Sequence, residues 1–263
     1  AIKTLRTNMQ FSGVETKSIV LTSCYPNEGK SDVAFQLAVE IGKMGKRVLI
    51  IDADIRKSSY IKRYQIKQKT NGLSQYLSGQ VALEEIIYST NYRNLEIIFS
   101  GPYAPNPSEL LEQGRFGRLI EETRKVYDYI LIDCMPSLGM LTINAVAAAD
   151  SILIPVQAAY LPVKGLEQLI KTIGKVKRQI NPRLEIEGIL MTMVDSRTTY
   201  ARDISKLLIE NYGSRVRIFN SSIPMSVRAA EISAEGTSIY KHDPYGKVAK
   251  AYQSLTEEVL GNE

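Results

Sequence analysis

Cysteine, histidine and tryptophan are scarce or missing in this chain of 263 residues, which has two cysteines, one histidine and no tryptophan. Cys24 and Cys134 are too few for a disulfide scaffold or a zinc cluster. His242 has no second imidazole or thiol near it in the sequence, so we do not expect it to bind a metal. The composition therefore excludes small disulfide-rich folds and zinc proteins, and it predicts a reducing, cytoplasmic setting.

Long uninterrupted apolar runs are missing as well. The most apolar region, residues 143–156, is broken by Asp150 and Pro155, and no apolar stretch of signal-peptide length follows the basic start of the chain. We therefore expect a chain that neither spans a membrane nor is exported. The net charge of +5 is small for this length, so it permits a polyanionic partner without indicating one.

Short β-branched, apolar runs alternate along the chain with longer amphipathic segments. Such an alternation predicts the α/β class, with a mostly parallel central sheet of about seven strands flanked by helices. The amphipathic segments include residues 164–180 and 247–260. No linker or repeat divides the chain, so residues 1–263 are expected to form one domain. The predicted strands, each a continuous apolar run, are residues 18–22, 47–52, 95–99, 129–133, 151–155, 186–193 and 216–219.

A glycine-lysine-serine loop follows the first predicted strand and precedes a helical run that begins at Asp32. Gly29 lets the backbone approach phosphate oxygens, Lys30 reaches the β- and γ-phosphates, and Ser31 binds Mg²⁺. Cys24 stands where the usual pattern has its first glycine. Strand, loop and helix together predict a P-loop NTPase fold that binds ATP and Mg²⁺. The predicted nucleotide contacts in this region are Pro26, Asn27, Glu28, Gly29, Lys30, Ser31 and Asp32.

Three aspartates stand at or just after the ends of two further predicted strands, Asp52 and Asp54 at one and Asp133 at the other. The carboxyl ends of parallel strands meet at the edge of the sheet that carries the loop. Ser31, Asp54 and Asp133 are therefore the expected metal site, with Asp133 binding Mg²⁺ directly or through water. Asp52 and Asp54 can divide metal binding from activation of the nucleophile, which makes them the catalytic candidates together with Lys30.

These residues resemble the MinD/ParA-type P-loop ATPases, which carry a deviant Walker A loop and an additional acidic strand end. The resemblance covers nearly the whole chain, but its halves resemble different families. Residues 1–133 resemble the cytoplasmic bacterial tyrosine kinases of capsule and exopolysaccharide synthesis, at residues 5–11, 26–31, 52–57, 72–79, 100–102 and 105–111. That resemblance implies an oligomerisation role for an N-terminal helical segment, residues 1–16, and a membrane adaptor protein as partner.

Residues 134–263 resemble instead the ParA/Soj partitioning ATPases of chromosomes and plasmids, at residues 136–145, 190–198 and 223–231. This resemblance implies that Asp195 and Pro224 lie near the adenine of the nucleotide. It also implies that Arg197 and Arg228 are among basic residues that meet DNA without sequence preference, and that a ParB-like protein is a partner.

The chain departs from both family patterns. ParA-type loops place a signature lysine five residues before the loop lysine, where it reaches a partner's nucleotide, and this chain has Tyr25 there. This departure argues against an ordinary nucleotide-sandwich dimer. The kinases usually end in a tail crowded with tyrosine acceptors, whereas Tyr240, Tyr245 and Tyr252 are dispersed here. Tyr252 is expected to pack on an apolar helix face, which leaves Tyr240 and Tyr245 as candidate phosphoacceptors.

Two functions remain open. The favoured one is a tyrosine kinase, in which Asp52 or Asp54 accepts the proton of the attacking hydroxyl, because Tyr25 and the residues around Asp54 follow the kinase pattern. The alternative is a partitioning ATPase that hydrolyses ATP and binds DNA, in which Asp54 orients water. Either predicts a cytoplasmic homo-oligomer, a ring or a dimer, peripheral to the membrane in the first case and to the nucleoid in the second.

Overall fold

A computed structural model describes residues 17–55, 60–64, 66, 70–102, 114–136, 139–158, 163–195 and 197–261. The N-terminal segment 1–16, with its expected oligomerisation role, lies outside the described residues. So do residues 105–111, which carry part of the kinase-like pattern.

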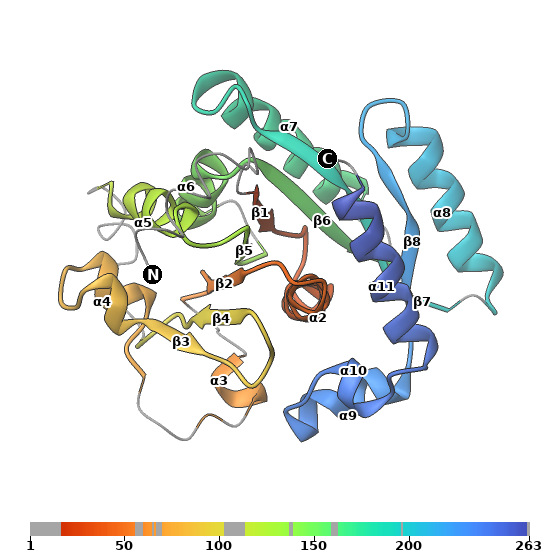
Figure 1. The fold of residues 1–263 in the computed structure, drawn as a ribbon. Coiled ribbons are helices and arrows are strands. Elements are labelled where there is room, and N and C mark those ends of the chain that lie inside the picture. Colours follow the sequence, from red (N-terminus) through yellow and green to blue (C-terminus); the bar gives the residue numbers. More distant parts are fainter. Residues whose placement is uncertain are drawn as a thin grey trace.

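One eight-stranded sheet forms the centre of the molecule (Figure 1), in the order β3-β4-β2-β5-β1-β6-β7-β8. Every neighbouring pair is parallel except β3 and β4. The predicted α/β class and mostly parallel sheet are therefore confirmed. The strands are β1 (Lys17–Leu21), β2 (Val48–Asp52), β3 (Ile87–Ser89), β4 (Leu95–Ile98), β5 (Tyr129–Asp133), β6 (Ser151–Gln157), β7 (Glu185–Val194) and β8 (Ile218–Pro224).

Most strands lie within two residues of their predicted ends, but two differ by more. β3 was not expected, because it is only three residues long and half-exposed at the sheet edge, so it lacks a continuous apolar run. β8 was predicted at residues 216–219 but begins at Ile218 and extends to Pro224. Its middle, residues 220–222, is polar, and a carboxylate from α11 supplies acceptors for the backbone there. In both cases the strand depends on contacts with distant segments of the chain, β4 for β3 and α11 for β8.

Helices cover both faces of the sheet (Figure 1). On one face lie α2 (Lys30–Lys43) and α11 (Lys247–Leu260). On the other lie α5 (Arg115–Arg124), α6 (Met140–Ala148), α7 (Val163–Gln179) and α8 (Thr199–Tyr212). The shorter helices are α3 (Tyr60–Arg63), α4 (Leu73–Leu77), α9 (Val227–Glu235) and α10 (Ile239–His242), with a 3₁₀ turn at Leu83–Glu85. The helix predicted at residues 247–260 has the observed bounds of α11.

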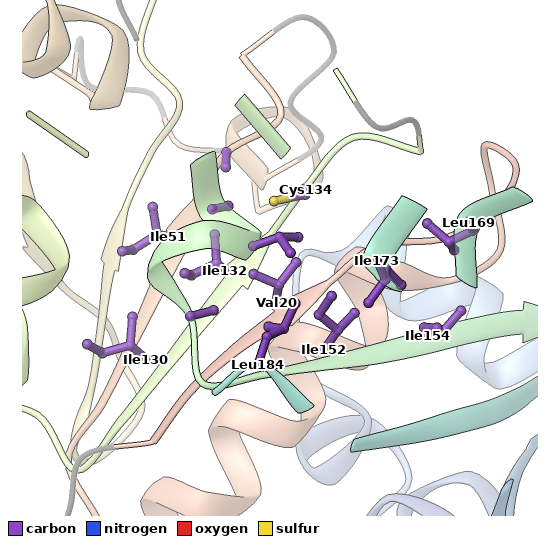
Figure 2. Packing of buried hydrophobic residues seen from close by; sticks show 14 of the residues in the cluster. Val20, Ile51, Ile130, Ile132, Cys134, Ile152, Ile154, Leu169, Ile173 and Leu184 are labelled. Carbon is purple, nitrogen blue, oxygen red and sulfur yellow. The ribbon is translucent and has the colours of Figure 1, made fainter. Parts of the chain in front are cut away.

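The strands bury both of their faces. Along β1, Ile19 and Leu21 pack toward α2 and α11, while Val20 packs toward the helices of the other face. Figure 2 shows Val20 and Ile152 of the sheet beside Ile173 of α7. Each fully buried aliphatic side chain contributes roughly 1.5–3 kcal/mol of transfer free energy. Burial on both sides explains why these runs are apolar throughout.

The described part of the chain contains no helix with the length and apolar character needed to cross a bilayer.

Candidate functional site

The loop between β1 and α2 has the backbone of a phosphate cradle. Asn27 and Gly29 adopt left-handed conformations, with φ of 64° and 83°. A Cβ on Gly29 would meet nothing nearer than Met193 Cε at 3.8 Å, so the conformation and not crowding requires glycine. Left-handed residues in such a loop turn successive N–H groups toward one concave side. Gly29 then caps the N-terminus of α2, which adds positive potential at the same point.

Lys30 is held inside its own loop. Its side chain is buried, and Nζ donates a hydrogen bond to Ser23 Oγ at 3.0 Å. Burial lowers the pKa of Lys30, while the charges of Asp133, Glu28 and Asp54 favour the ammonium form. The structure therefore brings the loop lysine and the predicted acidic residues into one electrostatic site.

Asp52 and Asp133 stand side by side at the carboxyl ends of β2 and β5, where they are paired in register. Both are fully buried. Asp52 Oδ1 accepts a hydrogen bond from the Asp54 N–H at 3.2 Å, which turns the chain at the end of the strand. Asp54 lies near enough for its charge to act on Asp133 and Lys30. The three predicted carboxylates thus gather beside the loop.

Asp133 has an unusual environment for a carboxylate. Neither of its oxygens accepts a hydrogen bond of good geometry from the described residues. Burial raises the pKa of Asp133 to about 6, and the Ser31 hydroxyl and the Lys30 charge oppose the rise only in part. A buried carboxylate without well-formed hydrogen bonds costs free energy unless a cation or donor meets it. Its position beside the Ser31 hydroxyl therefore fits a Mg²⁺ ion.

Protein oxygens alone do not complete such a metal site. Within the described ranges, no three carboxylate, imidazole or thiol side chains are grouped so that they could hold a metal ion. Mg²⁺ in phosphoryl-transfer sites is commonly bound by one or two protein groups together with substrate phosphates and water. The arrangement is therefore that of a site in which metal and nucleotide bind together.

A cavity of about 380 Å³ extends from the loop to the ends of β7 and β8. This volume lies within the range of small-ligand pockets. Asp32 and Pro224, both predicted nucleotide contacts, contribute to its walls. The cavity is lined by Gly29, Asp32, Val33, Thr192, Met193, Ile223, Pro224, Met225, Ser226, Ala229, Ala230, Ile232, Val248 and Tyr252.

Asp195 does not belong to that lining as the structure describes it. Its carboxylate accepts two hydrogen bonds at 2.8 Å from the Arg197 guanidinium, which holds the pKa of Asp195 down at about 2. The expected contact of Asp195 with adenine stays a prediction; in this structure the aspartate is the ion-pair partner of Arg197. Sequence reasoning placed it at the correct strand end but could not identify the arginine two residues on as its partner.

Arg197 and Arg228, the predicted DNA contacts, follow the ends of β7 and β8 at the edge of the sheet that carries the loop. Each already contacts a carboxylate. Arg197 pairs with Asp195, and Arg228 Nη1 lies 3.1 Å from Asp243 Oδ1. Both arginines are exposed, so a phosphate backbone could reach them but would compete with these carboxylates.

The candidate phosphoacceptors differ in accessibility. Tyr240 is only 8% exposed, and Lys43 Nζ lies 3.4 Å from the centre of its ring. Burial also raises the pKa of its hydroxyl far above the usual range. The Tyr240 hydroxyl is buried in this structure, which argues against Tyr240 as a phosphoacceptor. Tyr245 is 86% exposed and remains a candidate phosphoacceptor. Tyr252 is buried on α11, as expected.

Three residues that were not predicted complete the site. Ser23 holds Lys30, and the Tyr60 hydroxyl donates to the Ser31 carbonyl oxygen at 3.2 Å. Thr192 Oγ1 donates to the Glu28 carbonyl oxygen at 2.9 Å. Tyr60 and Thr192 come from segments far from the loop in sequence, so no local pattern could have identified them.

Comparisons of sequence place this site in a family. A family model described as an AAA domain matches residues 17–186. The sporulation initiation inhibitor protein Soj of Bacillus subtilis strain 168 is 32% identical over 255 residues, which cover 94% of this chain and 99% of that protein. The chromosome partitioning protein ParA of Myxococcus xanthus is 36% identical over 239 residues, covering 88% of this chain and 83% of that protein. The likeness thus continues across residue 134, where the two resemblances meet.

Comparisons of structure agree on the fold. A McdA–ATP complex from Cyanothece superposes with a TM-score of 0.81 at 21% identity, covering 95% of this chain and 98% of that chain. The kinase domain of the Escherichia coli tyrosine kinase ETK superposes with a TM-score of 0.64 at 26% identity, covering 76% of each chain. With a P-loop, the acidic strand ends and relatives that match along nearly the whole length, the chain belongs to the ParA/Soj family within the MinD/ParA group of P-loop ATPases.

Proposed function

We propose that the protein is a Mg²⁺-dependent ATPase switch of the Soj/ParA type, in which ATP binding and hydrolysis control self-association and retention on DNA. The observation that carries the ATPase is the buried Asp133 carboxylate, whose oxygens accept no hydrogen bond of good geometry from the described residues, beside Ser31 and Lys30. The Soj-type reading is preferred to the kinase because the Soj and ParA relatives match through both halves of the chain. The proposed setting is the surface of the nucleoid in the cytoplasm.

The loop residues have distinct proposed roles. Lys30 leaves Ser23 to meet the β- and γ-phosphates, and N–H groups of residues 27–31 donate to phosphate oxygens. Ser31 and Asp133 would hold Mg²⁺, which supplies positive charge against the phosphates when it is bound. Asp54 orients the attacking water. Asp52 fixes Asp54 through the hydrogen bond to its N–H.

Hydrolysis of ATP tests the first part of the proposal. Purified protein is expected to release phosphate from Mg-ATP slowly, and Lys30→Met should abolish this activity because the phosphates lose their buried cation. Lys125→Met is a matched control, since Lys125 is exposed directly after α5 and pairs only with Glu122 of that helix among the described residues. An active Lys30→Met variant would contradict the assignment.

Retention on duplex DNA tests the second part. With ATP, the protein should bind DNA of unrelated sequences equally well, and higher salt should weaken binding because phosphate contacts release counterions. Arg197→Ala and Arg228→Ala should each weaken retention while ATP hydrolysis without DNA persists. A ParB-like protein is the proposed partner that stimulates hydrolysis. Absence of ATP-dependent DNA retention in the wild type would overturn the partitioning assignment.

Tyrosine phosphorylation is a second candidate function, which two observations favour. Tyr245 is 86% exposed, and the kinase domain of ETK shares the fold at 26% identity. In this alternative, Asp52 or Asp54 accepts the hydroxyl proton and a membrane adaptor protein is the partner. Incubation with Mg-ATP followed by mass spectrometry would then find phosphate on Tyr245 that is lost in Lys30→Met and in Tyr245→Phe. Unmodified tyrosines together with ATP-dependent DNA retention would exclude the kinase.

A further inference from the structure

Glu28 is a charged residue in the middle of a loop that must receive phosphates, yet its side chain does not face solvent. Glu28 is 3% exposed. An acidic side chain at this position would repel the nucleotide if its charge were free to approach the phosphates. Its burial therefore requires an explanation from its contacts.

Both carboxylate oxygens of Glu28 accept backbone hydrogen bonds. Oε2 accepts from the Tyr25 N–H at 2.8 Å, which closes the loop upon itself. Oε1 accepts from the N–H of Gln157, the last residue of β6, at 3.3 Å. The charge is thus spread over two fixed donors, as is usual for a buried carboxylate that is stable in the folded state.

The backbone of Glu28 also makes a hydrogen bond to a further strand, β7. Its carbonyl oxygen accepts from Thr192 Oγ1 of β7 at 2.9 Å. Together with β1, from which the loop continues directly, three adjacent strands of the sheet hold this residue. The loop is therefore fastened at its centre and not only at its two ends.

Tyr25 links Glu28 to the rest of the loop through its backbone. Its N–H donates to Glu28, and its carbonyl oxygen accepts from Ser23 Oγ at 2.7 Å. Ser23 Oγ also accepts from Lys30 Nζ. One short chain of hydrogen bonds thus fixes the peptide groups of the loop and the position of the catalytic lysine.

We propose that Glu28 is a positioning residue, whose buried carboxylate holds the phosphate loop in its nucleotide-binding conformation before ATP arrives. The inference rests on the proposed function, because it takes Mg-ATP as the ligand. Its physical basis is pre-organisation: a loop that populates the competent conformation only fractionally binds with an affinity reduced by that fraction. Glu28 acts through the loop backbone and makes no contact with the reacting atoms.

Glu28→Gln is the sharpest test, because glutamine keeps the size but has only one acceptor oxygen for the two N–H donors. We expect the Kd for Mg-ATP, measured by titration calorimetry, to rise about tenfold, the loss expected for one such hydrogen bond. The rate of hydrolysis at saturating ATP should stay within about twofold of wild type, because bound nucleotide restores the loop. This split between affinity and rate distinguishes positioning from catalysis.

Two further variants keep the test decisive. Thr192→Val removes only the hydroxyl that donates to Glu28, and it should raise the Kd about threefold even if Glu28→Gln folds poorly. Glu187→Gln removes another buried glutamate, which pairs with Lys17 at the far end of β7. That control should lower the melting temperature without changing the Kd for Mg-ATP.

The outcomes separate this inference from the function on which it rests. A wild type that does not bind Mg-ATP overturns both. A wild type that binds, with Glu28→Gln and Thr192→Val binding within twofold of it, overturns the inference alone. So does a Glu28→Gln variant that binds normally but hydrolyses ATP much more slowly, because Glu28 would then act in the chemistry.

Discussion

The charge of Asp133 destabilises the folded protein without nucleotide, because the cost of its burial exceeds what Ser31 and Lys30 return. Burial raises its pKa to about 6, above the usual value for an aspartate in an unfolded chain. In the range between the two values the native state binds more protons than the unfolded state. Stability should therefore fall as pH rises through this range, and the cost stays at its full value above pH 6. The residue needed for the metal is thus a source of instability in the empty site.

Replacement of Asp133 by asparagine tests this cost. We expect Asp133→Asn to raise the free energy of unfolding of the nucleotide-free protein at pH 7.5 by roughly 1–3 kcal/mol, since it removes the buried charge. Mg-ATP should no longer raise the melting temperature. Urea denaturation with and without Mg-ATP measures both effects. Asp128→Asn is the control of opposite sign, because Asp128 accepts a hydrogen bond from the Arg47 N–H. A destabilised Asp133→Asn variant would contradict the argument.

Cys24 gives a second prediction at the scale of one residue. Burial, and after it the charge of Glu28, raises the pKa of the Cys24 thiol to about 12. Because the thiolate is the reactive form, a disulfide reagent at pH 8 should modify Cys24 at least about a hundredfold more slowly than a free cysteine. Burial also raises the pKa of Cys134, so unfolding in urea should release both thiols to react at the ordinary rate.

A single variant shows which of the two thiols reacts. Cys24→Ser leaves only Cys134, and its reaction in the folded state should be slower still because Cys134 is fully buried. Rapid modification of folded wild type that is absent in Cys24→Ser would show that Cys24 is reactive and the prediction wrong.

At the scale of the element, α11 is fastened to β8 by a carboxylate. Glu258 Oε1 and Oε2 accept from the N–H groups of Ser221 and Asn220 at 2.6 and 3.0 Å, and Arg217 lies nearby. Burial alone would raise the pKa of Glu258, but these donors and the Arg217 charge outweigh it, so the pKa is lowered. The stabilisation is therefore fully present above the pKa of the unfolded chain and is lost as pH falls through the lowered value.

Glu258→Gln should lower the free energy of unfolding by about 1–2 kcal/mol at pH 7, because one N–H loses its charged acceptor. The difference from wild type should shrink when denaturation is repeated near pH 4 or below. Glu257→Gln is the matched control, since Glu257 is the exposed neighbour on the same helix. An equal effect of the two substitutions would show that the contact with β8 does not stabilise the fold.

Elements with continuous apolar runs could be predicted from the sequence, and those that depend on partners could not. β1, β2, β4 and β5 are recognisable because burial on both faces demands apolar residues throughout. β3 is too short for any period, and β8 continues through Asn220 and Ser221 only because Glu258 accepts from them. The missing information lies in contacts between distant segments.

In the site, too, the local patterns could be predicted from the sequence and the contacts between distant segments could not. The Gly29-Lys30-Ser31 sequence and the strand-end aspartates are local patterns, and the structure brings them together as predicted. Glu28 was predicted as a nucleotide contact, but its carboxylate accepts from a residue 129 positions away and its carbonyl from one 164 positions away. The surroundings of Asp195 and Tyr240 were missed for a related reason, because an ion pair and a buried environment depend on neighbours that spacing does not reveal.

At the scale of the whole molecule, Tyr25 bears on how two copies would meet. Tyr25 is 47% exposed, and a Cβ on Gly165 of α7 would lie 3.0 Å from its ring, so the side chain rests on its own subunit. ParA-type ATPases have at this position the lysine that reaches a partner's nucleotide. The wild type should therefore form only a weak dimer with ATP.

Tyr25→Lys should shift the ATP-bound protein toward a dimer, because an exposed cation is restored beside the nucleotide site. Sedimentation velocity with and without ATP measures the change. Tyr25→Leu controls for loss of the ring without gain of charge and should behave as the wild type does. Equal dimer fractions in all three proteins would show that this position does not control association.

The hydrogen bonds of Glu258 also matter for how the sheet ends. β8 is the last strand on its side, and an edge strand with free N–H groups is a template on which another chain can add and aggregate. Glu258 already occupies two of those donors. The carboxylate that holds α11 against β8 therefore also prevents another strand from adding to this edge of the sheet.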